Sequence, residues 1–493
     1  MNNFYKYSLL VALTLPFSGC QKNLNLPDSI RNFDIVTPLG LSNKEAKYSE
    51  SCDMSSNYRS LAKEKNDDLN SYLNLGGYAY QQRDYVTSNQ YFDKAINKYK
   101  FFENKGLIST SRTLSYVTAS FLNDTFLDYE GDGYEKVMMH NYKAINYLML
   151  NDKEKARVEI MNSYKKQMEE KQKFEQEIAE YKKEEVKQAQ EEQKLPLRKQ
   201  RYQKSRVSIY EKLKPLFEGV SSEHMPYQNP FAYYISALVF EENGEWDDAY
   251  IDIKKAYDFY SDSDIIKQKL LYYAKKAYGE SSSEYQGYAK KFAMSSNMSD
   301  KRAEIFINLA SSPKKEQMKV PIYIGSAMQF TSFPTFNLDL HNKESVIVKD
   351  ASGNVVAKSS ILSDIDAIVV NTFKERVTGI ILRQVINVGG KTAISEQISE
   401  KADSGNVFVS AAVGLGMSVV NAVTSKADTR GWDTLPSAIH ALSFNRDEGQ
   451  TYTAYVVNKN GSVLASQPLK FEAGKNLKNS YAILDVKSKT ICK

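Results

Sequence analysis

A pattern of small and aromatic residues that recurs three times constrains the fold of this chain more than any other feature of its sequence. Small residues let two helices approach closely, and aromatic residues fill the gap to the next helix pair. The three copies are Tyr72, Leu75, Gly76, Ser88, Phe92 and Ala95, then Ala144, Tyr147, Ala156 and Ile160, then Tyr233, Ala237, Phe240, Ala249, Ile253 and Ala256. Turns are expected at Asn151–Asp152 and near Asn243–Gly244. The pattern therefore predicts a stack of helical hairpins.

This spacing resembles that of the tetratricopeptide repeat (TPR), although Ala79 stands where the repeat has Tyr and the final Pro is missing. We predict a mainly α protein with a C-terminal α+β domain. TPR-like helices would cover residues 66–150 and 226–315, a charged helical arm residues 151–225, and the α+β domain residues 316–493. Residues 20–65 are polar, which is typical of a tether.

The arm between the second and third copies is unusually rich in charge. Residues 165–204 are nearly all Lys, Arg, Glu and Gln, and Pro196 interrupts them. The sequence predicts a long helix, a break at this proline and a shorter returning helix. Such a long charged hairpin is either a solvated surface helix without a partner or a contact arm that forms a coiled coil.

From Lys319 onward the composition favours strands. Val320–Ile324 alternates, the segments flanking residues 350–353 predict a hairpin, and Asn460–Gly461 predicts a second. Tyr481–Val486 would be the last strand of a small sheet of four to six strands, packed with helices that include residues 364–398. The uncharged segment Val407–Val423 is shorter than the roughly twenty apolar residues of a membrane span and rich in small residues, so a buried helix is expected there rather than a membrane element.

The N-terminus predicts export. Lys6 precedes an apolar run from Leu9 to Leu15, which ends in Phe17-Ser18-Gly19-Cys20. The end of this run resembles a bacterial lipobox, so residues 1–19 would be removed and Cys20 would carry lipid, including palmitate. The alternative is an ordinary signal peptide that happens to contain a cysteine. Gln21 replaces the Asp that usually retains lipoproteins at the inner membrane, which favours an outer-membrane protein that faces the periplasm.

Two further cysteines, Cys52 and Cys492, would then lie in an oxidising compartment. They form either a disulfide or two separate thiols, and the sequence alone leaves both possibilities open.

The sequence carries little sign of a reaction. A formal net charge of +5 over 493 residues is too small to favour a nucleic-acid partner. Val388–Thr392 has the tail of a phosphate-binding loop, but Val385 stands where the motif needs glycine, so no nucleotide is expected. Four isolated histidines, His140, His224, His341 and His440, predict no metal. Lone carboxylates such as Glu135 and Glu159 do not identify a catalytic acid or base. We therefore expect neither an enzyme nor a cofactor.

Two segments are more specific than packing requires. One runs from Tyr129 to Leu148 and begins Tyr-Glu-Gly-Asp-Gly-Tyr-Glu, and the other is Asp428-Thr429-Arg430-Gly431-Trp432-Asp433-Thr434-Leu435-Pro436. With Asn229–Ala232 and Trp246–Tyr250, they resemble an uncharacterised family of TPR-like lipoproteins of Gram-negative bacteria. The resemblance implies an envelope protein, with other envelope proteins as partners and no assigned activity. Its members are often encoded near lipoproteins that activate peptidoglycan synthases.

The second motif has two interpretations. Asp428 and Arg430 are close enough to pair, Trp432 and Leu435 would bury against the small domain, and Pro436 would end the turn. This describes a structural clamp; the alternative is a loop that binds a polar ligand, such as a glycan of the peptidoglycan.

Surplus tyrosines of the repeats suggest where a protein partner docks. Tyr supplies contact area at low entropic cost. The candidates are Tyr72, Tyr78, Tyr80, Tyr147, Tyr233 and Tyr234. The competing interpretation is that all of them belong to the core.

Overall fold

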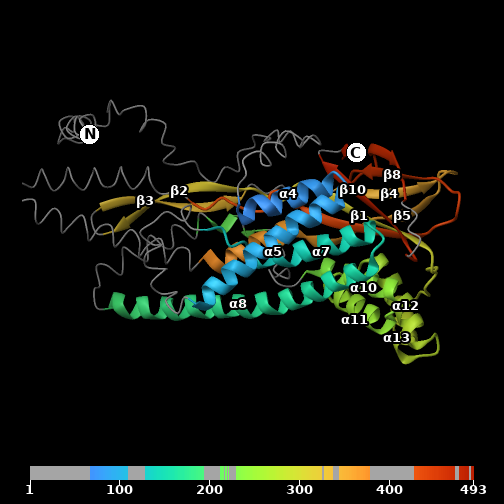
Figure 1. Ribbon diagram of the computed structural model, residues 1–493, viewed down its shortest axis with the longest axis horizontal. Coiled ribbons are helices and arrows are strands. Elements are labelled where there is room, and N and C mark those ends of the chain that lie inside the picture. The colour runs from blue at the N-terminus through green and yellow to red at the C-terminus, as the bar shows by residue number, and fades with distance from the viewer. Residues whose placement is uncertain are drawn as a thin grey trace, which may run out of the picture.

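The computed structural model describes residues 67–108, 128–193, 211, 213–215, 217, 218, 220, 229–324, 327–336, 344–377, 427–471, 477–487 and 490–492. Helical hairpins lie side by side and cover one side of a set of sheets (Figure 1). The mixed α and β composition agrees with the predicted class.

Within the described residues, four helical hairpins form the layer. They are α4 (Leu69–Gln81) with α5 (Tyr85–Ile108), α7 (Gly133–Met149) with α8 (Lys153–Gln193), α10 (Pro230–Asn243) with α11 (Trp246–Phe259), and α12 (Asp264–Tyr278) with α13 (Ser283–Phe292). The first three are the predicted copies, and both predicted turns are present. Asn151 and Gly244 adopt φ values of 62° and 81° there, which lets the chain reverse. The fourth hairpin was not predicted.

Small residues hold the paired helices close together, as the pattern predicted. A Cβ added to Gly76 would lie 2.4 Å from the ring of Phe92, so only glycine allows α4 and α5 to approach this closely. Ala144 and Ala156 are fully buried in the second pair, and Ala237 and Ala249 in the third.

The described part of the chain after these hairpins forms three sheets. Their strands are β1 (Arg302–Leu309), β2 (Lys315–Ile324), β3 (Ala327–Phe336), β4 (Ser345–Asp350), β5 (Val355–Lys358), β6 (Ser360–Asp364), β7 (Ala438–Asn445), β8 (Tyr452–Val457), β9 (Val463–Pro468), β10 (Ser480–Lys487) and β11 (Thr490–Cys492). The five-stranded sheet has the order β11-β10-β1-β7-β6, the four-stranded sheet β5-β4-β8-β9, and β2 pairs with β3 alone. Residues 365–377 form a helix after β6.

Both predicted hairpins and the last predicted strand are confirmed. β4 pairs with β5 across residues 351–354, and β8 pairs with β9 across a turn in which Gly461 has φ 78°. Two expectations were wrong. The described strands form three sheets rather than one sheet of four to six strands, and strands begin at Arg302 rather than after residue 315. β1 is parallel to β10 and antiparallel to β7, so this unpredicted strand is the centre of its sheet.

The charged arm begins as the predicted long helix, α8, but its first half is not a solvated surface helix. Ala156, Ile160 and Phe174 are buried against the neighbouring helices. Most of the predicted returning helix, the part of the predicted helix beyond residue 377 and Val407–Val423 lie outside the described residues. Within the described ranges, no helix is both long and apolar enough to cross a membrane.

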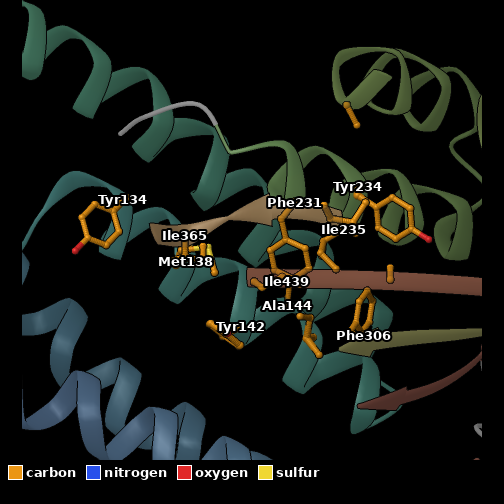
Figure 2. Close-up of a cluster of buried hydrophobic side chains, with 14 of the residues drawn as sticks. Tyr134, Met138, Tyr142, Ala144, Phe231, Tyr234, Ile235, Phe306, Ile365 and Ile439 are labelled. Carbon is orange, nitrogen blue, oxygen red and sulfur yellow. The ribbon is translucent and has the colours of Figure 1, made fainter. Parts of the chain in front are cut away.

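One continuous core joins the helices to the five-stranded sheet. Figure 2 shows side chains of α7 and α10 facing Phe306 of β1 and Ile439 of β7. The rings of Phe231 and Phe306 meet edge to face with centroids 6.1 Å apart. A second cluster fills the space between the five-stranded and four-stranded sheets. The helical part and the α+β part therefore share one hydrophobic core and do not form two separately packed domains.

Candidate functional site

The two segments that the sequence marked as unusually specific meet in space. Residues 128–135 enter α7, and residues 427–437 lead into β7. Gly131 lies at the meeting point with φ +72°, and a Cβ there would come within 2.8 Å of Tyr99 Oη and 3.0 Å of Glu135 Oε2. Only glycine allows this turn to approach the neighbouring side chains so closely.

Glu135 ties the two segments together. Its carboxylate is fully buried. It accepts a hydrogen bond from the hydroxyl of Tyr129 at 2.7 Å, from the backbone N–H of Asp132 at 2.9 Å and from the backbone N–H of Trp432 at 3.0 Å. One side chain of α7 therefore holds its own N-terminal turn and the distant loop at the same time.

Asp132 carries the cationic side of the same cluster. Arg376 Nη1 lies 2.6 Å from its Oδ1 and Lys315 Nζ lies 3.2 Å from its Oδ2. Arg376 also pairs with Glu177 on α8 at 2.9 Å. We call Tyr129, Asp132, Glu135, Lys315 and Arg376 the Glu135 cluster. It joins α7, α8, β2 and the helix at residues 365–377.

The two carboxyl groups of this cluster have opposite pKa shifts. Burial, together with the charge of Asp132, raises the pKa of Glu135 to about 7. Burial alone would also raise the pKa of Asp132, but the charges of Lys315 and Arg376 lower it to about 2. Among the described residues, no Lys or Arg nitrogen makes a salt bridge with Glu135. Glu135 is therefore the titratable member, and Asp132 stays ionised.

Trp432 packs against the helices, not against the small domain as predicted. Its ring lies between those of Phe92 and Tyr142, with centroids 5.5 Å and 5.8 Å away, and it is 4% exposed. Its Nε1–H donates to the hydroxyl of Thr434 at 2.6 Å. The predicted pairing of Asp428 with Arg430 is confirmed at 2.8 Å. Leu435 and Pro436 are also buried, which is how a clamp behaves.

Half of the candidate docking tyrosines belong to the core. Tyr78, Tyr80 and Tyr234 are buried, so the prediction that these three lie on a surface was wrong. Tyr80 and Tyr234 both belong to the main core cluster, and the ring of Tyr80 packs edge to face against that of Tyr142 on α7 at 4.6 Å. Tyr234 also donates to Glu304 of β1 at 3.1 Å.

The other three candidates, Tyr72, Tyr147 and Tyr233, remain partly exposed and share one arrangement. Each lies on the first helix of its hairpin beneath a lysine of the second helix. The ammonium-to-centroid distances are 5.5 Å for Lys94 over Tyr72, 5.6 Å for Lys155 over Tyr147 and 5.4 Å for Lys255 over Tyr233. We call these the three Tyr–Lys pairs.

A second buried charged cluster was missed by the sequence reasoning. Arg302 of β1 donates to both carboxylate oxygens of Glu241 on α10 at 2.5 Å and 2.6 Å, and to Glu304 at 3.2 Å. Lys269 of α12 pairs with Glu304 at 2.6 Å. We call these four residues the Arg302 cluster. In the sequence, this cluster leaves one sign: two charged residues, Arg302 and Glu304, stand at alternate positions of an otherwise mostly apolar segment.

Other candidate residues have structural partners or lie outside the described residues. His140 is buried, with Nδ1 2.7 Å from Glu159, and His440 is buried in β7. The described residues contain no group of three or more His, Cys, Asp and Glu side chains placed to hold a metal ion. Cys492 on β11 is disulfide-bonded. Cys52 lies outside the described residues, as do Cys20, His224 and His341, so the pairing of Cys52 with Cys492 stays a prediction.

Comparisons by sequence and by structure found no family model, curated protein or solved structure that matches this chain.

Proposed function

We propose that this protein is an outer-membrane lipoprotein, anchored through Cys20 and facing the periplasm, whose TPR-like helical hairpins dock other proteins of the cell envelope, including proteins of peptidoglycan synthesis. The observation that carries the docking role is the repetition of the Tyr–Lys pair in three successive hairpins. Packing requires small residues at these helix contacts but does not require a partly exposed ring beneath a lysine in three successive hairpins.

The chemistry of the three pairs suits a protein surface. A tyrosine ring offers a rigid apolar area, and the lysine above it adds positive charge and stiffens the ring. Around Tyr72 the surface is extended by Tyr91, whose ring stacks at 6.5 Å and lies beneath the same Lys94. Such a surface would favour a partner that presents apolar groups beside carboxylates.

The loop around Trp432 supports the alternative, a glycan-directed protein, less well. Carboxylates do lie beside Trp432, as that alternative requires. The indole, however, is enclosed by Phe92 and Tyr142, and its N–H is already bonded to Thr434. A sugar that stacked on this ring would have to displace the loop.

Site-specific photo-cross-linking in intact cells tests the docking role. A photoreactive residue replaces Tyr72, Tyr147 or Tyr233 in the full chain, and the captured proteins are identified. Tyr455 is the matched control, because it lies beneath Lys349 at 5.3 Å on β8 of the four-stranded sheet. The full chain is used because a cut at residue 310 would separate β1 from its sheet.

We expect the three helical positions to capture the same envelope protein and Tyr455 to capture none of it. Capture from Tyr455 alone would refute docking on the helices. The anchor is tested by replacing Cys20 with Ala, which should release the protein from the outer-membrane fraction; continued fractionation with that membrane would refute the lipobox.

A further inference from the structure

A buried carboxylate distinguishes the third Tyr–Lys pair, Tyr233 with Lys255, from the other two. Asp252 of α11 is buried, and its Oδ1 accepts a hydrogen bond from Lys255 Nζ at 3.0 Å. Its Oδ2 accepts from the hydroxyls of Tyr164 on α8 and Ser236 on α10, and these two hydroxyls lie 3.1 Å apart. One side chain therefore joins three helices and also holds the cation of the pair.

Lys255 is the exposed partner in this ion pair. Its side chain is 43% exposed, whereas that of Asp252 is 2% exposed. The ammonium lies 5.2 Å from the ring centroid of Tyr164 and 5.4 Å from that of Tyr233, and the two ring centroids are 6.5 Å apart. The same ammonium thus contacts a buried carboxylate and two partly exposed rings. The charge on Asp252 therefore determines how much of the charge on Lys255 is left for a docked protein.

The lysines of the other two pairs have no buried carboxylate of this kind. Lys155 pairs with Asp152 at 2.7 Å, but this carboxylate is partly exposed. Burial alone would raise the pKa of Asp152, but the hydrogen bond and charge of Lys155 lower it, so Asp152 stays ionised. Lys94 lies over the rings of Tyr72 and Tyr91 and forms no salt bridge within the described residues. Lys94 is therefore the matched control for Lys255.

The surroundings of Asp252 allow it to take up a proton at mildly acidic pH. Burial raises the pKa of Asp252 to about 6, because the charge and hydrogen bond of Lys255 offset only part of the effect. In the part of the chain that the structure describes, the titratable side chains in contact with this carboxyl are Tyr164 of α8 and Lys255 of α11, and α10 contributes the hydroxyl of Ser236. A proton from solvent would remove the negative charge beside Lys255 and leave both hydroxyls as hydrogen-bond partners.

We propose that Asp252 regulates the third Tyr–Lys pair: the ionised carboxylate neutralises Lys255, and the protonated carboxyl leaves the ammonium free to bind a carboxylate of the docked protein. The third pair then binds more tightly at mildly acidic pH than at neutral pH, whereas the first pair, with Lys94, does not change. This inference rests on the docking role proposed above and adds the regulation of one of its three contacts.

The first test needs no partner protein. A double-mutant cycle of Asp252→Asn and Lys255→Met in the purified full chain measures the coupling of the two side chains by urea denaturation. At pH 7.5 the coupling should change the unfolding equilibrium constant by about fivefold or more, and at pH 5 by less than about twofold. Equal coupling at the two pH values would overturn the proposal.

Lys255→Met alone gives the same decision if Asp252→Asn does not fold. It should destabilise the chain more at pH 7.5 than at pH 5, because only the ionised Asp252 needs the cation. Lys94→Met is the control and should have the same effect at both pH values. A cost of Lys255→Met that is as large at pH 5 as at pH 7.5 would overturn the proposal.

The second test measures docking with both pairs intact. A photoreactive residue replaces Met168, an exposed residue one turn after Tyr164 on α8, or Asn97, an exposed residue one turn after Lys94 on α5. Isolated cell envelopes that contain the full chain are cross-linked at pH 5.5 and 7.5. Capture of the envelope protein from Met168 should be about threefold higher or more at pH 5.5, and capture from Asn97 should not change.

Asp252→Asn separates regulation from docking. Because Asn carries no charge at either pH, this variant should give the higher capture from Met168 at both pH values. Capture from Met168 that does not depend on pH, or a pH dependence that persists in Asp252→Asn, would overturn this proposal alone. Absence of capture from both positions at both pH values would overturn the docking role on which it rests.

Discussion

The helices meet the sheets at two buried charged clusters that differ in how their charges are matched. The Arg302 cluster contains two cations and two anions in direct contact. The charge of Arg302 lowers the pKa of Glu241 although burial opposes this. In the Glu135 cluster the cations contact Asp132, and Glu135 receives only neutral donors. In the first cluster Arg302 therefore favours the ionised form of Glu241, whereas the second holds a carboxyl group whose pKa is raised to about 7.

This difference shows that burial alone does not decide what a charged group does. All four members of the Arg302 cluster are as deeply buried as Glu135. The position of the nearest opposite charge decides whether the group stays ionised. We expect the Arg302 cluster to control stability and the Glu135 cluster to control how firmly the loop at residues 427–437 is held.

The largest expected effect comes from breaking the Arg302 cluster. Arg302→Met leaves Glu241 buried without its cation and should lower the free energy of unfolding by about 3–5 kcal/mol, measured by urea denaturation. The matched control is Lys301→Met. The ion pair of Lys301 with Glu448 is highly exposed, so its loss should cost less than about 1 kcal/mol. Equal effects of the two substitutions would mean that the cluster is not a structural link.

A smaller effect is expected at the turn that enters the Glu135 cluster. Gly131→Ala places a Cβ 2.8 Å from Tyr99 Oη at a positive φ, which should cost roughly 1–3 kcal/mol in the same denaturation experiment. Gly431→Ala is the control on the opposite side of the junction, because a Cβ there meets no atom within 4 Å. If Gly431→Ala lowered the free energy of unfolding as much as Gly131→Ala, the steric constraint would lie in the loop at residues 427–437 and not in the turn at Gly131.

Much of the helical layer could be predicted from the sequence, because its signals are local. Gly76 and Phe92 contact each other within one hairpin, and Asn151 and Gly244 mark turns of a few residues. The centre of the five-stranded sheet could not be predicted in the same way. β1 pairs with strands far along the chain, and its residues fall inside the range 226–315 that was assigned to TPR-like helices. The partners of its Arg302 and Glu304 lie on α10 and α12, which the local sequence does not show.

The site shows the same limit. The sequence identified both specific segments, and the Asp428–Arg430 pair follows from a spacing of two residues. It did not place Trp432, because the rings that enclose this side chain come from helices more than 280 residues earlier in the chain. Nor did it show that Tyr78, Tyr80 and Tyr234 would be buried.

The pH dependence of stability tests the contrast between the two clusters most directly. The folded pKa of Glu135, about 7, lies above its ordinary value of 4.5. Its contribution to stability is therefore present below pH 4.5 and is lost as the pH rises through 7. Glu241 has a lowered pKa, so its contribution is present above its ordinary value of 4.5 and is lost only as the pH falls below that value.

The decisive measurement is the free energy of unfolding by urea between pH 4.5 and 8 for the wild type, Glu135→Gln and Glu241→Gln. The wild type should lose stability across this window, on the order of 3 kcal/mol from this one group. Glu135→Gln should remove that loss, and Glu241→Gln should retain it while lowering stability throughout. A Glu135→Gln chain that lost as much stability as the wild type between pH 4.5 and 8 would contradict the account.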